Sequence, residues 1–219
     1  MTVQRDIILK EAAMGRFLRD NGLSIALGLL FLGSLAGMIL AGWHQDIDEA
    51  LRDGAPLPTL GGYIVSAGFV SALFENWESE FLQMGVYVVL TAMLFQRGSA
   101  ESRDPDDPGR GNDQPGPGIG GWLYAHSLGL ALGALFILSF VLHLLGSWRD
   151  FLEEAMREGE APQTMWQYLG SSRMWFESMQ NWQSEFLSTG VLVLLSIILR
   201  QVGSPESKPV QAPDAQTGG

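Results

Sequence analysis

The chain has 219 residues, 47% of them hydrophobic, and a formal net charge of −11. Long uncharged runs place it in the membrane class rather than among soluble enzymes. The acidic balance argues against nucleic acid as a partner. Because the sequence has no cysteine, disulfides, thiolate nucleophiles and cysteine-bound metals are excluded.

The N-terminal region has two parts. Residues 1–20 mix charged and apolar residues in loose helical spacing, which predicts an interfacial helix. Residues 23–43 carry no charge, and at ~1.5 Å per residue they can cross a hydrocarbon core of ~30 Å. A signal peptide is the alternative for this run, but a similar run recurs in the middle of the chain, so we expect a retained span.

The chain contains an internal repeat. The motif "NWESEFL" at residues 76–82 returns as "NWQSEFL" at 181–187, so Trp77 aligns with Trp182 at an offset of 105 residues. The same offset holds without a gap from about residue 15 to residue 102 of the first copy. We therefore predict two repeats, 21–97 and 122–202. Their spans are predicted at 23–43, 77–97, 123–148 and 182–201.

Two shorter elements are expected between the spans of each repeat. The residues after Trp43 and Trp148 predict a short amphipathic helix on the outer surface, ended by a glycine with a proline beyond. The segments at 60–74 and 165–179 are apolar but too short and too polar to span. They predict embedded helices that turn into the next span at the "NW" pair, with a re-entrant hairpin as the alternative. The fold class is thus an all-α membrane protein with four spans in a tandem parallel repeat.

The charge distribution predicts the orientation. The linker at 98–121 and the tail at 203–219 are rich in Pro, Gly and Ser, which predicts a flexible linker and a disordered tail. Lysine and arginine gather in the N-terminal segment, the linker and the tail, whereas the other two loops are acidic. By the positive-inside rule we expect a multi-pass protein of the cell inner (cytoplasmic) membrane with both termini cytoplasmic. The repeats are then related by an axis along the membrane normal.

Two residue patterns predict packing and membrane placement. Small residues at four-residue intervals are expected to let helices approach closely. These are Ser24, Gly28, Gly33, Gly37, Gly129 and Gly133. Tryptophans near the outer span ends predict an aromatic belt in contact with lipid. These are Trp43, Trp77, Trp148 and Trp182.

Glu80 and Glu185 are the duplicated acidic residues nearest the hydrocarbon. Together with Asn76 and Asn181, each one turn earlier, they are candidates for an outer mouth that attracts cations. The alternative is structural, because a carboxylate near a helix N-terminus is favoured by the helix dipole.

Other chemistry has little support in the sequence. His143 lies within the third span, but its repeat partner is Met38, so we predict a packing residue rather than a ligand or relay group. No phosphate loop, zinc motif or nucleophile with its base is present, so we expect no enzyme activity and no cofactor or metal.

The pattern "NWQSEFL…LRQVGSPESKPV" of the second repeat and its shorter copy in the first repeat resemble an uncharacterised family of bacterial integral-membrane proteins. The resemblance covers nearly all of both repeats. This resemblance implies no activity. A shorter motif, a Trp-Gln start before an apolar span with a Gln/Arg end, is similar to small low-affinity iron permeases.

The sequence leaves two alternative functions open. We expect a cation channel or permease that works as a homo-oligomer. The alternative is a scaffold or accessory subunit docked on another membrane protein. Against a proton relay, the second and fourth spans offer few polar side chains, namely Tyr87, Thr91, Thr189 and Ser196.

Overall fold

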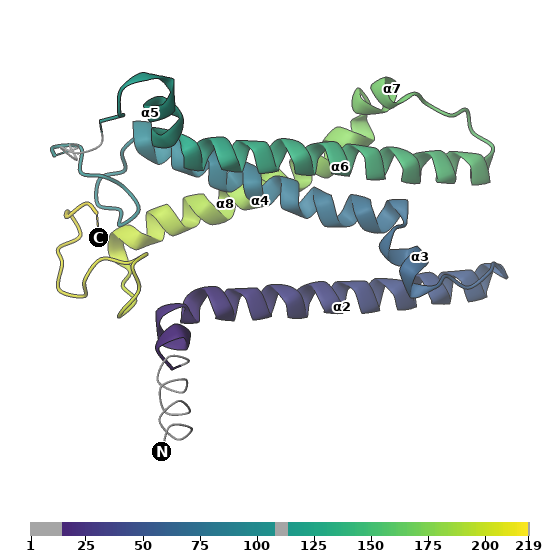
Figure 1. Ribbon diagram of the computed structural model, residues 1–219, viewed down its shortest axis with the longest axis horizontal. Coiled ribbons are helices and arrows are strands. Elements are labelled where there is room, and N and C mark those ends of the chain that lie inside the picture. Colours follow the sequence, from purple (N-terminus) through teal and green to yellow (C-terminus); the bar gives the residue numbers. More distant parts are fainter. Residues whose placement is uncertain (1–14, 108–113, 219) are drawn as a thin grey trace, which may run out of the picture. The chain divides into compact units, whose positions relative to one another are not determined.

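The computed structural model describes residues 15–107 and 114–218, and in these ranges helices are joined by loops and no strand occurs (Figure 1). The chain divides into two compact units, Met1–Ser66 and Ala67–Gly219, and each is described here by itself. Residues 15–20 are helical. The rest of the predicted interfacial helix lies outside the described residues.

The repeat is visible as two equal sets of three helices. The first set is α2 (Gly22–Asp53), α3 (Leu60–Ile64) and α4 (Ala67–Met93). The second set is α6 (Ser127–Glu158), α7 (Met165–Leu169) and α8 (Ser172–Ile198). Every boundary of the second set lies at the offset of 105 residues found in the sequence, from residue 22 to 127 and from residue 93 to 198. A short helix, α5 (Gly118–Ala125), precedes the second set.

The first helix of each set is longer than a span. At 32 residues, α2 and α6 each extend ~48 Å. The predicted outer amphipathic helix is therefore not a separate element, because no glycine or proline interrupts the helix after Trp43 or Trp148. The predicted glycine stop is confirmed: Gly54 and Gly159 follow the last turns with φ of 68° and 72°, the left-handed conformation that glycine adopts most easily.

The loops that follow α2 and α6 are each held by a hydrogen bond from a tryptophan. The indole N–H of Trp43 donates to the carbonyl of Pro58 at 2.9 Å, and that of Trp148 donates to the carbonyl of Gln163 at the same distance. Thr59 and Thr164 then cap α3 and α7. These two tryptophans, predicted for the lipid belt, thus also hold the return loops in place.

The second long helix of each set runs without a break through the "NW" pair. α4 and α8 each have 27 residues, so the turn predicted at this pair is wrong. The break lies earlier, where the Ser171 hydroxyl accepts from the N–H of Met174 and caps α8. The third predicted span is also shortened, because the helix breaks at His126 and α6 begins only at Ser127.

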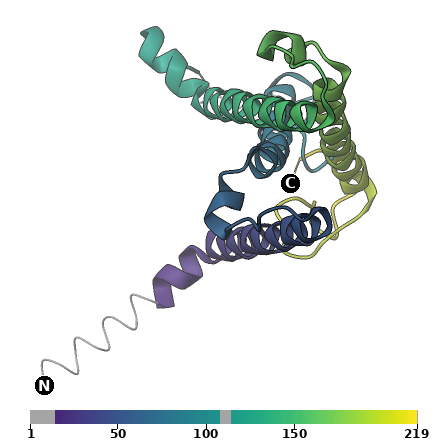
Figure 2. The same ribbon diagram turned by 90° about the vertical axis from the view of Figure 1, so that its right-hand side faces the viewer.

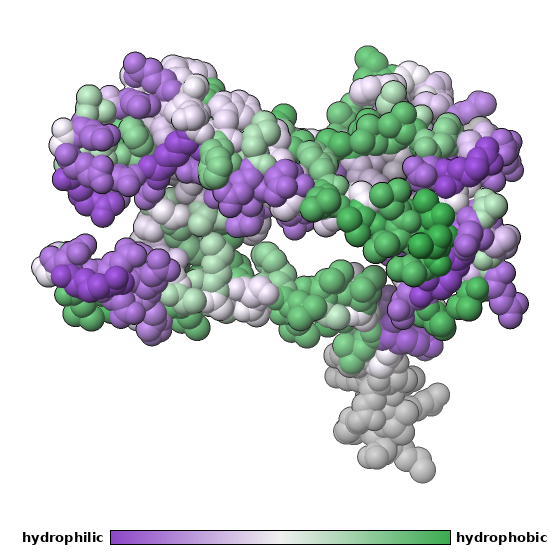
Figure 3. Space-filling view, turned by 180° about the vertical axis from the view of Figure 1, so that it is seen from behind, coloured by the Kyte–Doolittle hydropathy of each residue, from purple (hydrophilic) through white to green (hydrophobic). Residues whose placement is uncertain are grey.

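Among the described residues two helices, α2 and α6, rather than the four predicted spans, are long and apolar enough to cross a membrane by length and composition. The polar run around residues 76–80 or 181–185 makes α4 and α8 less apolar. Large apolar side chains are exposed along α2, among them Leu29, Leu30 and Leu32. Figure 3 shows hydrophobic residues over the middle of α2 and hydrophilic residues gathered toward helix ends.

The second unit is held together by helix packing. α4 packs along α6 and, over a shorter stretch, against α8 (Figures 1 and 2). The closest approach is at Gly146 of α6, where an added Cβ would stand 2.6 Å from the backbone nitrogen of Ser71. Gly129 is in ordinary contact range of Val89, and Gly133 has open space around it. Close packing is therefore shown at Gly146, which the small-residue pattern did not include.

The other predicted packing positions lie in the first unit, where α2 packs with α3. Ser24, Gly28, Gly33 and Gly37 therefore stay as predictions. In this unit the close approach is at Gly42, where an added Cβ would overlap the Tyr63 ring.

The tail after α8 is ordered by hydrogen bonds, although its composition predicts disorder. The ammonium of Lys208, 1% exposed, donates to the carbonyls of Gly98, Asp214 and Gln216. The backbone N–H of Gly98 in turn donates to the Thr217 hydroxyl at 2.9 Å. The tail thus closes onto the loop that follows α4.

Candidate functional site

A fully buried histidine of the second unit lies between two carboxylates. His143 of α6 and Glu78 of α4 are both 0% exposed. The Nδ1 atom of His143 lies 2.6 Å from Oε2 of Glu78, a short distance typical of a charge-assisted hydrogen bond. The other carboxylate oxygen of Glu78 accepts from the indole N–H of Trp182 on α8 at 2.8 Å. Three helices therefore meet at this pair.

The second carboxylate is that of Glu177 on α8. Its Oε2 lies 3.4 Å from Nε2 of His143, within ion-pair range, but Nε2 makes no hydrogen bond in the described structure. The same oxygen accepts from the Ser147 hydroxyl at 2.6 Å. Because Ser147 uses its only proton there, the Tyr168 hydroxyl at 2.5 Å is the donor to Ser147. We call Glu78, His143 and Glu177 the acid–histidine cluster.

An arginine connects the cluster to solvent. Arg173 donates to Glu177, to Glu154 and to Asp150, at 3.2, 2.5 and 3.2 Å. The Arg173 side chain is 39% exposed and that of Glu177 is 23% exposed, whereas His143 is fully enclosed. Exposure to solvent therefore falls from Arg173 at the surface, through Glu177, to the enclosed ring of His143. Screening is weak in such an interior, so each charge there acts strongly on its neighbours.

Polar side chains continue from the cluster along the contact between α4 and α8. Gln83 donates to the Thr189 hydroxyl at 2.5 Å, one turn beyond Ser79. One turn further, the Tyr87 hydroxyl donates to Glu101 at 2.9 Å, and the Ser99 hydroxyl is bonded to that of Ser196 at the same distance. Gln83 and Tyr87 share a helix face because residues four apart do so. We call Gln83, Thr189, Tyr87 and Glu101 the polar row.

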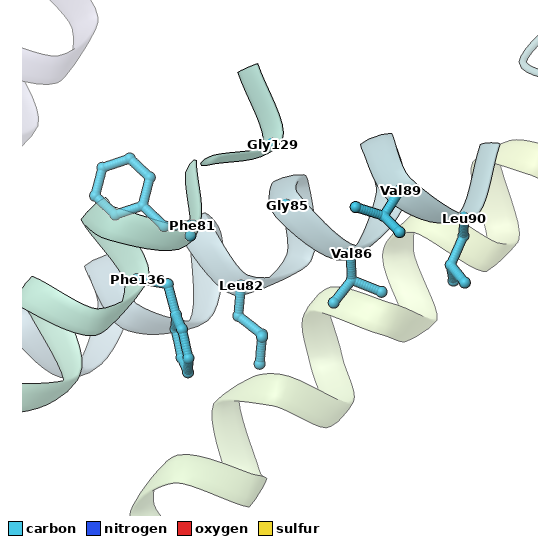
Figure 4. Close-up of a pocket in the computed structure, with 9 residues that line it drawn as sticks. Phe81, Leu82, Gly85, Val86, Val89, Leu90, Gly129 and Phe136 are labelled. Atoms are coloured by element: carbon cyan, nitrogen blue, oxygen red, sulfur yellow. The ribbon is translucent and has the colours of Figure 1, made fainter. Parts of the chain in front are cut away.

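Away from the Glu78–His143 pair, the contact between α4 and α6 is apolar. It contains a groove of about 350 Å³. Phe81, Gly85, Val89, Gly129, Gly133 and Phe136 are among the residues that line it (Figure 4). The predicted packing glycines Gly129 and Gly133 thus leave a cavity rather than a tight seam. Charged or polar ligands have no partner in it.

Of the predicted outer-mouth residues, Glu80 and Glu185 lie within electrostatic range of each other, whereas the two asparagines have different partners. Glu80 is exposed and Glu185 is half-buried. Asn76 donates to the carbonyl of Ala72 in its own helix, whereas Asn181 donates to Glu75 of α4 at 2.5 Å. The mouth stays a prediction, and the structure adds Glu75 to the residues around Asn181.

The predicted belt residues also divide. Trp182 points its indole N–H at Glu78 and lies edge-on to Trp175, with ring centroids 6.3 Å apart. Trp77 stacks edge-on with Phe74 at 5.2 Å. At least one predicted belt tryptophan is therefore part of the site.

The acid–histidine cluster was not predicted from the sequence. Site residues were predicted from duplication in both repeats, whereas His143 aligns with Met38, Glu78 with Gln183 and Glu177 with Ala72. A difference between the repeats could have indicated the cluster, namely an ionisable residue in an apolar run whose aligned residue in the other repeat is uncharged. The buried charges occur where the two repeats differ.

The fold and site define an all-helical protein made of a tandem repeat, with a buried acid–histidine cluster in its second unit. The chain belongs to the family described as "Domain of unknown function (DUF6766)", whose model matches residues 14–219. This agrees with the expected uncharacterised family. No curated protein and no solved structure matches the chain.

Proposed function

We propose that this protein is an integral membrane protein that moves cations, and that the acid–histidine cluster is the site where the cation is taken up. The observation that carries the proposal is the complete burial of Glu78 and His143 between helices. Buried ionisable groups are expensive to desolvate, and inside membrane helices they mark ion or proton pathways.

In this proposal four helices span the membrane, namely the two candidate spans and their partners in each repeat. The length and apolar composition of α2 and α6 support these two helices as spans. The pairing of equal helices at the 105-residue offset supports α4 and α8 as the other two spans, since each repeat then enters and leaves on the same side. In this arrangement the termini and linker face the cytoplasm, and the cluster lies near the outer ends of the spans.

The acidic outer loops support the same direction of entry. Asp150 and Glu154 stand at the wet edge of the cluster, held by Arg173. A negative field there raises the local concentration of cations, and Glu177, half-buried, is the first carboxylate of the cluster that an entering cation meets.

The alternative, a scaffold or accessory subunit, needs surface groups rather than buried ones. A docking role gives no reason for a carboxylate and an imidazole that are both 0% exposed. A homo-oligomer stays part of the proposal, although a polar row inside one unit does not require a pore between protomers. Mass measured in a mild detergent tests this: a monomer in every detergent would contradict it.

Cation flux into proteoliposomes tests the proposed function. We expect wild-type protein to conduct and Glu78→Gln to lose most of the flux, because the substitution removes the buried charge and keeps the shape. Glu153→Gln on the exposed face of α6 is the matched control and should conduct normally. If no cation among H⁺, Na⁺ and K⁺ crosses with wild-type protein, the scaffold is the better proposal.

A further inference from the structure

We infer that the cation is the proton, and that it crosses through the second unit from the acid–histidine cluster along the polar row to Glu101. This inference rests on the proposed function and names its substrate. Its basis is the geometry of the two groups of residues, which together extend from the outer end of α8 to the loop beyond α4.

The cluster has the geometry of a proton site rather than a metal site. A metal ion needs several ligand atoms directed at one point, and no group of three or more candidate ligands in the described residues meets that condition. In the cluster the two carboxylates instead face opposite ring nitrogens, at 2.6 and 3.4 Å. Both contacts are favourable at the same time when each ring nitrogen carries a hydrogen. The site therefore binds one proton more than a neutral imidazole carries, as the imidazolium form of His143.

A proton passes through the ring of His143 in two transfers. Neutral His143, with its hydrogen on Nδ1, accepts a proton at Nε2 from Glu177, which becomes a carboxylate. The imidazolium then releases the Nδ1 proton to Oε2 of Glu78. The ring is left with its hydrogen on Nε2, and the starting tautomer returns when a water molecule takes the Nε2 hydrogen and a proton is given back to Nδ1. Nε2 has no hydrogen bond in the described structure, so it is the end of the ring that is ready to accept.

Charged and titratable groups surround this ring on every element packed against it. α4 contributes Glu75 and Glu78, α7 contributes Tyr168, and α8 contributes Glu177 and Arg173. On its own helix, Asp150 holds Arg173 from the other side. Acidic groups outnumber the single arginine, which favours a cation at the ring.

The polar row continues the path. Gln83 lies five residues beyond Glu78 on α4, ~7.5 Å by helical rise, and Tyr87 lies one turn beyond Gln83, ~6 Å. Water molecules bridge gaps of this length. Gln83 and Thr189 are bonded to each other across the helix contact, and Tyr87 is bonded to Glu101 beyond it. Hydroxyl and carboxyl groups can take up one proton while they release another, and the Gln83 amide holds the Thr189 hydroxyl in place.

Glu101 is suited to receive the proton at the inner end. Burial, and then the neighbouring carboxyl of Glu206, raise the pKa of Glu101 above its usual range. Glu101 and Glu206 occupy the same position in the two repeats. Two adjacent carboxyls hold one proton between them more readily than two separate ones, so this pair can take a proton from Tyr87 and pass it to the cytoplasm.

Two substitutions interrupt the row without adding charge. Tyr87→Phe removes one hydroxyl and Gln83→Leu removes one amide. Full-length protein is reconstituted with a pH-sensitive dye inside the vesicles, and a K⁺ gradient with valinomycin drives inward proton flux. We expect each substitution to reduce that flux at least about tenfold, the order of effect expected when a positioned proton carrier is lost. Tyr124→Phe, at a tyrosine 84% exposed on α5, should leave the flux unchanged.

The outcomes separate the two proposals. If Na⁺ or K⁺ crosses but protons do not, the inference is overturned and the proposed cation transport stands. Proton flux that survives both row substitutions, in variants with wild-type helicity and elution volume, overturns the path. If no cation crosses at all, the proposed function fails as well.

Discussion

Removal of the buried imidazole should destabilise the second unit strongly. His143→Leu keeps the volume roughly constant but leaves the carboxylate of Glu78, 0% exposed, with the Trp182 indole as its remaining donor. The loss of one partner from a buried pair costs about 3–5 kcal/mol, because the other charge stays buried without compensation. For a chain of this size 1 kcal/mol corresponds to about 2–4 °C, so we expect the melting temperature to fall by at least about 6 °C.

A double-mutant cycle isolates the interaction. Glu78→Gln in the His143→Leu background removes the stranded charge and should recover much of the lost stability. Thermal unfolding in detergent, followed by far-ultraviolet circular dichroism, measures all four proteins. If the two substitutions are additive within about 0.5 kcal/mol, the residues do not interact and the reasoning behind the cluster is refuted.

Three further outcomes are expected. Gly146→Ala should lower stability by about 1–3 kcal/mol, because its Cβ would meet the Ser71 backbone, whereas Gly133→Ala, with open space around it, should be nearly neutral in the same melting assay. The raised pKa of Glu101 means that its contribution to stability is full below the unfolded value of 4.5 and is lost as pH rises through the folded value. Glu101→Gln should therefore flatten the decline in melting temperature with rising pH, and an unchanged decline would contradict the assignment. Lys208→Met should free the tail, seen as faster limited proteolysis after α8, since three carbonyls lose their donor.

Local features of the fold could be predicted from the sequence. The 105-residue offset correctly placed two equal sets of helices, because similar sequences make similar local hydrogen bonds. Gly54 and Gly159 ended their helices as predicted, since the left-handed conformation depends on the residue itself. The continuous α4 was missed because a polar "NW" pair looks like a break, although nothing in it disfavours a helix.

Only the tertiary structure decided which faces meet. Glu78 and His143 are 65 residues apart in sequence, and helical periodicity does not reveal that their faces point at each other. The same holds for Gly146, where the close approach depends on how α6 crosses α4. The sequence by itself determined the repeat and the glycine ends of α2 and α6, which depend on neighbours along the chain. The acid–histidine cluster and the polar row depend on three helices packed together, so they became visible only in the folded unit.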